Sequence, residues 1–179
     1  MSVIATEKLQ KTYGKKETAF TALKDVDLAI EPGESIAIIG KSGSGKSTLM
    51  HLLALLDKPT SGSVAVDGKN AHQLPRRQLD DLRNQSFGFV FQQFFLNANN
   101  TVLDNVILPL KIAGIGRRER TRRGMEVLEA VELADKARNK ANDLSGGQKQ
   151  RVCIARALIN APRIILCGRA YRQPGQPHR

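Results

Sequence analysis

One glycine-rich segment in the first third of the chain constrains the fold more than any other. It fits the spacing G-x-x-x-x-G-K-[S/T]. Its residues are Gly40, Lys41, Ser42, Gly43, Ser44, Gly45, Lys46, Ser47 and the adjoining Thr48. The apolar run 35–39 before it predicts a short strand, and leucines at helical spacing predict a helix over 46–56. A strand that passes through glycines into a helix is typical of a phosphate-binding loop.

The residue types of this loop suit a phosphate ligand. Glycine tolerates positive φ, so successive backbone N–H groups can turn inward and form a concave nest for phosphate oxygens. Lys46 is expected to reach the β- and γ-phosphates of a nucleotide, and the Ser47 hydroxyl is expected to bind Mg²⁺. The alternative is a glycine-rich turn without a ligand, which the flanking strand and helix disfavour.

Length and composition limit the class of protein. The 179 residues are 41% hydrophobic and 25% charged, a balance that indicates a globular domain rather than a disordered chain. We expect neither a membrane-spanning helix nor a secretory signal, because no apolar run is long enough. The net charge of +11 favours anionic partners without choosing among nucleotides, nucleic acids and lipid headgroups. Two cysteines without metal-ligand spacing argue against a disulfide framework.

Strand and helix patterns alternate at both ends of the chain and flank a helix-rich block. Strands are predicted over 25–30, 35–39, 63–66, 87–91 and 164–166, a polar helix or loop over 74–83, and helices over 46–56, 101–113, 117–131 and 147–159. Thr101 is expected to cap the helix that follows it, and Pro109 to kink that helix. This order favours a parallel α/β core that carries a helical insertion.

A second motif opens the helix predicted over 147–159. It reads Leu144-Ser145-Gly146-Gly147-Gln148 and continues as Lys149-Gln150-Arg151. Alone it is a helix cap joined to a flexible turn, although a hydroxyl and free N–H groups at a helix N-terminus also suit an anion. Together with the upstream phosphate loop, it resembles the signature of the ATP-binding subunits of ABC transporters. The resemblance covers residues 1 to about 166.

The resemblance implies an α/β fold of the P-loop NTPase type, with an N-terminal antiparallel β portion, a helical subdomain, and the C-terminal part of the core missing. In those terms residues 1–92 are the β portion and P-loop core, 93–146 the helical subdomain, 147–166 the return to the core, and 167–179 an aberrant tail. The stretches 88–94 and 101–106 look like the subgroup that serves lipoprotein release, macrolide export and antimicrobial-peptide export.

Further residues match positions that carry roles in this family. Tyr13 lies where the family places an aromatic ring that stacks on adenine; the alternative is an ordinary, partly buried tyrosine. Gln92 matches the glutamine whose amide contacts Mg²⁺ or the attacking water; the alternative is a surface amide. The signature binds ATP held by a second subunit, and Ser145 and Gly147 would contact its γ-phosphate, with Gly146 and Gln148 beside them.

The resemblance also implies a mechanism and partners. Two ATPase subunits pack head to tail, ATP and Mg²⁺ bind between them, and closure and hydrolysis drive integral-membrane permease subunits. The expected location is cytoplasmic, peripheral on the inner face of the plasma membrane. The arginines within 117–123 raise a nucleic-acid alternative, but no aromatic residues interleave with them, so a solvated helix face is favoured and no nucleic acid is expected.

The pattern departs from the family after residues 164–166. There the family has an Asp that holds Mg²⁺ through water and then a Glu that activates the attacking water, and a switch histidine follows later. This chain has Cys167, then Gly168 at the Asp position and Arg169 at the Glu position, and no matching histidine. The alternative function is therefore a nucleotide-binding fragment that does not hydrolyse ATP, because neither side chain can do that chemistry.

A single-base frameshift at Cys167 accounts for this departure. Residues 167–179 have a codon choice that, with its first base removed, reads Ala-Asp-Glu-Pro-Thr-Gly-Asn-Leu-Asp-Ser-His-Thr. That peptide resembles the family's sequence at this place, so we expect a frameshift from a mutation or a sequencing error. Sequencing the gene through codon 167 tests the hypothesis, and codons that do not give this peptide when shifted contradict it.

Overall fold

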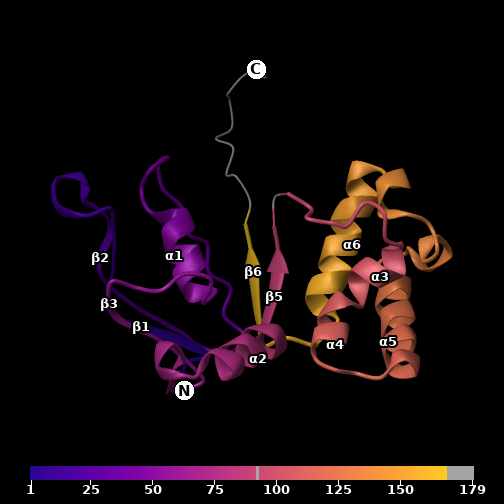
Figure 1. The fold of residues 1–179 in the computed structure, drawn as a ribbon, viewed down its shortest axis with the longest axis horizontal. Coiled ribbons are helices and arrows are strands. Elements are labelled where there is room, and N and C mark those ends of the chain that lie inside the picture. Colours follow the sequence, from indigo (N-terminus) through magenta and orange to yellow (C-terminus); the bar gives the residue numbers. More distant parts are fainter. Residues whose placement is uncertain (92, 169–179) are drawn as a thin grey trace. The chain divides into compact units, whose positions relative to one another are not determined.

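The computed structural model describes residues 1–91 and 93–168 (Figure 1). They fall into two units, Met1–Arg83 and the residues from Asn84 onward. The first unit carries an antiparallel sheet and the glycine-rich loop, and the second carries most of the helices and a parallel strand pair. Gln92 and the tail from Arg169, including the position matched to the family's Glu, lie outside the described residues.

The sheet of the first unit is antiparallel throughout. Its strands, in spatial order, are β2 (Phe20–Ile30), β1 (Ile4–Tyr13), β3 (Ser61–Val66) and β4 (Lys69–Asn70). Its buried side chains include Ile4, Leu9, Val64 and Val66. The strands predicted over 25–30 and 63–66 are confirmed as parts of β2 and β3.

Two helices and two single turns of 3-10 helix complete this part of the chain. They are η1 (Lys16–Thr18), α1 (Lys46–Leu53), η2 (Ala71–Gln73) and α2 (Arg76–Ser86). Leu52 and Leu53 of α1 are buried. The helix is shorter than the predicted span 46–56 because Leu55 adopts a left-handed φ of 58°, which an α-helix does not accommodate.

The strand predicted over 35–39 is wrong. These residues form no ladder, and Ile36 and Ile39 are 47% and 73% exposed. A strand exists only where a neighbouring strand pairs its N–H and C=O groups. Within the described residues, the antiparallel sheet uses β1 to β4, and β5 and β6 pair with each other. The apolar run therefore has strand composition but no partner.

The strand pair of the second unit is parallel. β5 (Phe87–Val90) pairs with β6 (Ile164–Cys167), with Phe87 opposite Ile164 and Val90 opposite Cys167. This confirms the strands predicted over 87–91 and 164–166. Gly88 is required where β5 passes close to the helix α6 (Gly146–Leu158), because a Cβ there would lie 2.5 Å from the Ala157 carbonyl oxygen. Close approach of backbone to backbone thus sets the position of β5.

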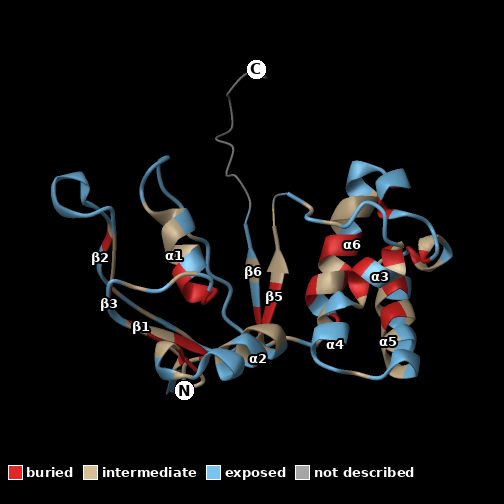
Figure 2. Ribbon diagram, in the orientation of Figure 1, coloured by how far each residue is buried: buried red, intermediate tan, exposed pale blue. Residues whose placement is uncertain are grey.

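The helices of the second unit enclose its hydrophobic core. They are α3 (Val102–Val106), α4 (Leu108–Ile112), α5 (Arg117–Ala130) and α6 (Gly146–Leu158), with 3-10 turns η3 (Ala134–Lys136) and η4 (Ala141–Asp143). Figure 2 shows the buried positions gathered where α3, α5 and α6 face one another. The core includes Val102, Val106, Leu110, Leu128, Leu133, Val152, Ala155 and Ile159. Among the described residues, none of the helices combines the length and apolar character that crossing a bilayer requires.

The helix predicted over 101–113 is interrupted. The hydroxyl of Thr101 accepts a hydrogen bond from the Asp104 amide at 3.0 Å, so the predicted cap is confirmed. The expected kink takes the form of a break at Ile107, which separates α3 from α4. The cause is Pro109, which has no N–H to donate to the carbonyl one turn earlier.

Gly124 provides a test of the packing between α5 and α3. A Cβ at this position would lie 2.5 Å from Ile107 Cγ2 and 2.6 Å from Leu103 Cδ1. Gly124→Val should therefore destabilise the chain by about 1–3 kcal/mol through overpacking, measured by urea unfolding. Gly116→Ala is the control, because a Cβ at Gly116 would meet no atom within 4 Å. Equal stability of the two variants would contradict this packing.

Candidate nucleotide site

The glycine-rich segment is a curled loop that leads directly into α1. Gly43 and Gly45 adopt φ values of 80° and 81°, which only glycine takes at little cost. The Ser44 amide donates to the Lys41 carbonyl oxygen at 3.2 Å and closes a turn. Lys46 Nζ donates to the same carbonyl oxygen at 2.6 Å and to Ser44 Oγ at 3.2 Å. The loop thus has the positive φ values and the helical exit that the motif predicts.

This loop is held against the sheet by contacts that need glycine. A Cβ at Gly45 would lie 2.5 Å from the Ala22 carbonyl oxygen and 2.9 Å from Leu23 Cδ2, both on β2. Gly45 is also the N-cap of α1. A larger residue here would move the loop away from β2 and would have to adopt a left-handed backbone. The start of the helix is therefore fixed by close backbone packing.

The N-terminus of α1 is open to an anionic ligand. In the described chain no side chain caps it, and its first turn contains no acidic residue. The first N–H groups of a helix have no partner within the helix, so here they are left for a ligand. Ser47, in that turn, is exposed. Backbone donors, the Lys46 ammonium and a hydroxyl together form a site suited to phosphate.

Mg²⁺ fits this site only in part. Mg²⁺ in proteins is held by one or two carboxylates together with substrate phosphates. Ser47 is exposed in the first turn of α1, and a hydroxyl is an oxygen ligand that Mg²⁺ accepts. The described residues contain no group of three or more His, Cys, Asp or Glu side chains that could hold a metal ion. Ser47 thus fits a cation that arrives with a nucleotide, while the family's carboxylate is absent from the sequence at Gly168.

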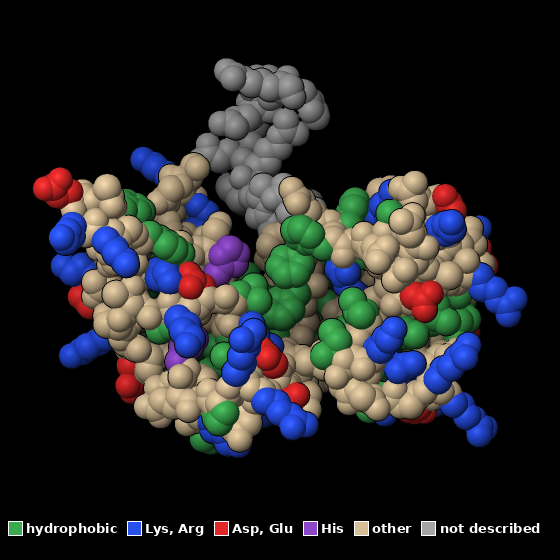
Figure 3. Space-filling view, viewed as in Figure 1, with side chains coloured by type: hydrophobic (Ala, Val, Ile, Leu, Met, Phe, Trp, Pro, Cys, Tyr) green, Lys and Arg blue, Asp and Glu red, His purple; other side chains and the backbone are tan. Residues whose placement is uncertain are grey.

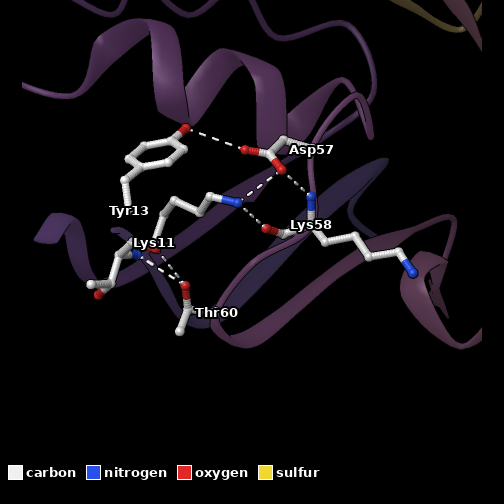
Figure 4. Close-up of polar contacts among 6 residues, drawn as sticks. Lys11, Tyr13, Asp57, Lys58 and Thr60 are labelled. Atoms are coloured by element: carbon white, nitrogen blue, oxygen red, sulfur yellow. Dashed lines mark hydrogen bonds and ion pairs between the residues drawn. The ribbon is translucent and has the colours of Figure 1, made fainter. Parts of the chain in front are cut away.

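Tyr13 ends β1 and is 42% exposed, so its ring is partly accessible (Figure 4). Its hydroxyl donates to Asp57 Oδ2 at 3.2 Å. Lys11 Nζ lies 4.9 Å from the ring centroid and pairs with Asp57 Oδ1 at 2.8 Å. Sequence reasoning missed Lys11 and Asp57, because they are far apart in the chain and neither belongs to a motif.

Asp57 carries a lowered pKa. The hydrogen bond from Lys11 is the main cause, and the Lys58 amide and the Tyr13 hydroxyl act in the same direction, while partial burial opposes them. All three donors favour the ionised carboxylate. Asp57 therefore remains charged in the folded chain to a lower pH than an isolated aspartate.

Asp57→Asn should make the chain less stable near neutral pH and lose that effect in acid. A carboxylate whose folded pKa is depressed stabilises the fold above its unfolded pKa, and this contribution is lost as pH falls through the folded value. The urea midpoint of the variant should lie below that of the parent at about pH 7, and the difference should shrink toward about pH 3. Asp81→Asn, at an exposed position of α2, is the control. A difference that does not change with pH would contradict the assignment.

The second motif forms a capped helix start. Ser145 is the N-cap of α6, its Oγ accepts from the Gln148 amide at 3.3 Å, and Gln148 Oε1 accepts from the Ser145 amide at 2.9 Å. Leu144 is buried and anchors the turn. Gly146 and Gly147 are exposed, and a Cβ on either would meet no atom within 4 Å. The turn thus presents open backbone at a helix N-terminus.

The end of β6 lacks a carboxylate. Gly168 follows the strand directly, and its amide donates to the Val90 carbonyl oxygen at 2.9 Å. Cys167 is exposed. The structure therefore places Gly168 at the carboxyl end of a parallel strand, the position at which α/β proteins usually present polar residues to a ligand.

Basic side chains are spread over the surface of each unit, and acidic side chains are interspersed among them (Figure 3). On α5, Arg122 pairs with Glu119 at 2.7 Å and with Glu126 at 2.6 Å, and Arg123 pairs with Glu119 at 2.7 Å. Hydrogen bonds from Arg122 and then Arg123 lower the pKa of Glu119 to about 2. These arginines are thus partly neutralised by acids on their own helix.

A protein-family model and the curated relatives of this chain both point to ABC transporters. The family described as ABC transporter matches residues 23–168. A macrolide export ATP-binding/permease protein, MacB, from Aggregatibacter actinomycetemcomitans is 48% identical over 166 residues, which are 93% of this chain and 26% of that protein. A lipoprotein-releasing system ATP-binding protein, LolD, from Geobacter metallireducens is 44% identical over 165 residues, 92% of this chain and 73% of that protein.

Solved structures that resemble this chain are also ATP-binding cassettes of ABC transporters. A dimeric bacterial ABC transporter cassette, MJ0796, matches with a TM-score of 0.82 and 45% identity over 92% of this chain and 72% of the cassette. The same cassette is also known in a post-hydrolysis state with ADP and Pi. This chain spans between 26% and 48% of the length of the first curated relatives. The family match covers most of the sequence and includes both nucleotide motifs, so the chain belongs to the ABC transporter family, as an ATP-binding domain.

Proposed function

We propose that the chain is the ATP-binding subunit of an ABC-type membrane exporter and acts by ATP binding and hydrolysis in a head-to-tail dimer. The observation that carries the proposal is the curled loop before α1, which combines left-handed glycines, an uncapped helix N-terminus and the Lys46 ammonium. The dimeric state of the related cassette supports a second ATPase subunit as partner. The names of the relatives support integral-membrane permease subunits as partners. They include a methionine import protein, MetN, as well as the macrolide exporter, so the export direction rests on the sequence resemblance of residues 88–94 and 101–106.

Each residue of the proposed site has a definite task. The backbone amides of Gly43 and Gly45, with those of Lys46 and Ser47 that follow, enclose the phosphates. Lys46 Nζ exchanges its contacts with the Lys41 carbonyl and Ser44 Oγ for the β- and γ-phosphates. Mg²⁺, when bound, neutralises phosphate charge, and Ser47 and Gln92 are the residues that would hold it. Tyr13 stacks on the adenine ring.

The signature acts on the nucleotide of the other subunit. Ser145 holds its hydroxyl at the start of α6, and the exposed amides of Gly146 and Gly147 lie beside it. These donors would contact the γ-phosphate across the dimer interface, with Gln148 keeping the turn in shape through its bond to the Ser145 amide. Binding of ATP thereby closes the dimer. We place this dimer at the cytoplasmic face of the plasma membrane, where its permease partners lie.

One observation favours a second function, nucleotide binding without hydrolysis. Gly168 lies directly after β6, and Arg169 follows it in the sequence. Glycine has no side-chain carboxylate to order water around a cation, and a guanidinium remains protonated at neutral pH and cannot act as a general base.

A paired measurement of ATP binding and phosphate release on one preparation tests both functions. Binding that is strongly weakened in Lys46→Ala supports the nucleotide site, and turnover decides between the two functions. Turnover that disappears in Lys46→Ala supports the ATPase, and binding without turnover supports the second function. Absence of ATP binding would overturn both.

A further inference from the structure

We propose that Lys11 and Asp57 are positioning residues that hold the Tyr13 ring ready to stack on the nucleotide base. The inference rests on the proposed function, in which Tyr13 binds adenine. It assigns a role to two side chains that belong to no motif and that the tertiary structure brings together across 46 positions of sequence (Figure 4). Both lie in the same unit as the phosphate loop.

The Tyr13 ring is held at two points. Its hydroxyl donates to Asp57 Oδ2 at 3.2 Å, which limits movement of the ring tip. Lys11 Nζ lies over one face, 4.9 Å from the ring centroid, within the range of a cation–π contact. An ammonium on one face leaves the opposite face for a planar ligand. Since the residue is 42% exposed, the ring is both oriented and accessible.

The two holding groups are themselves fixed. Lys11 Nζ donates to Asp57 Oδ1 at 2.8 Å and to the Lys58 carbonyl oxygen at 2.7 Å, and its side chain is only 12% exposed. Asp57 Oδ1 also accepts from the Lys58 amide at 2.7 Å. A partly buried ion pair with a second acceptor has few alternative geometries, in contrast to the surface pairs that contribute little.

The cluster also connects the ring to the phosphate loop through α1. The Asp57 amide donates to the His51 carbonyl oxygen of α1 at 3.3 Å, and α1 begins at Lys46 of the loop. A second tie lies one residue before Tyr13: Thr60 Oγ1 accepts from the Thr12 amide at 2.9 Å. The segment that leaves α1 therefore sets the position of the end of β1. A ring pre-positioned in this way loses less freedom when it binds a base.

Comparing ATP with inorganic tripolyphosphate tests the proposal, because only ATP has a base to stack. The variants are Lys11→Met, Asp57→Asn, Tyr13→Phe and Tyr13→Ala in the full chain, with binding measured by calorimetry and folding checked by circular dichroism. Tyr13→Ala should weaken ATP about tenfold and leave tripolyphosphate unchanged, the expected loss of one aromatic–base contact. Lys11→Met and Asp57→Asn should weaken ATP about threefold or more, again without changing tripolyphosphate binding.

A double-mutant cycle separates positioning from a general structural role. In the Tyr13→Ala background, Lys11→Met should have no further effect on ATP affinity, because no ring remains to be held. Lys11→Arg should retain most of the ATP affinity, and Tyr13→Phe should lose about twofold.

Three results would overturn the proposal. The first is equal weakening of ATP and tripolyphosphate by Lys11→Met, and the second is an effect of Lys11→Met that persists without the ring. The third is Tyr13→Ala binding ATP like the parent, which would also remove adenine stacking from the proposed function. Failure of the parent chain to bind either ligand would instead contradict the phosphate site itself and the inference with it.

Discussion

Lys46→Ala should reduce ATP affinity about 30-fold. The ammonium now donates to the Lys41 carbonyl oxygen and Ser44 Oγ, at the opening of the loop, and would transfer to phosphate oxygens on binding. Charge-assisted hydrogen bonds of this kind contribute about 1.5–3 kcal/mol each, and about 1.4 kcal/mol corresponds to a factor of ten. Calorimetric titration with ATP and Mg²⁺ measures the change.

Lys41→Ala is the matched control for this prediction. Lys41 belongs to the same loop, its side chain is exposed, and the carbonyl oxygen that accepts from Lys46 is retained in the variant. Net charge falls by the same amount in both variants, so any general electrostatic effect on an anionic ligand is shared. We expect Lys41→Ala to remain within about twofold of the parent. Similar losses in both variants would mean that the loop attracts ATP only by charge.

Under the second function, phosphate release by this chain should be at least about a hundredfold slower than release by the protein that the same gene gives when it is read in the shifted frame from codon 167. General-base catalysis alone contributes about 10²–10⁴ to a rate. This chain has Gly168 and Arg169 where the shifted frame places Asp and Glu. Steady-state release of inorganic phosphate at saturating ATP and Mg²⁺ measures the difference, with ATP binding determined on the same samples.

Lys46→Ala in the shifted-frame protein is the control for contaminating ATPases and should return release to background. Substituting Gly168→Asp and Arg169→Glu in the present chain separates the two carboxylates from the remainder of the shifted tail. The second function would be contradicted if the present chain releases phosphate as fast as the shifted-frame protein and loses this activity in Lys46→Ala. That result would show that the residues after β6 are not needed for hydrolysis.

The elements that sequence alone determined are those that depend on neighbours in the chain. The loop before α1 could be predicted because positive φ at Gly43 and Gly45 is a property of glycine, and the helix after it follows from leucine spacing. The caps at Thr101 and Ser145 are equally local, since each side chain bonds an amide three residues ahead. The nucleotide motifs and the family follow from such local patterns.

The tertiary structure alone decided what depends on residues far apart in the chain. The run 35–39 has the composition of a strand and yet has no paired neighbour among the described residues, because strand formation needs a partner that composition does not supply. Gly124 gave no signal in the sequence, but in the structure a Cβ at this position of α5 would collide with Leu103 of α3 and with Ile107. Lys11 and Asp57 meet beside Tyr13 only because β1 lies against the segment that leaves α1. Patterns of local sequence encode turns, caps and helix faces, whereas the orientation of the Tyr13 ring arises from the packing of distant segments.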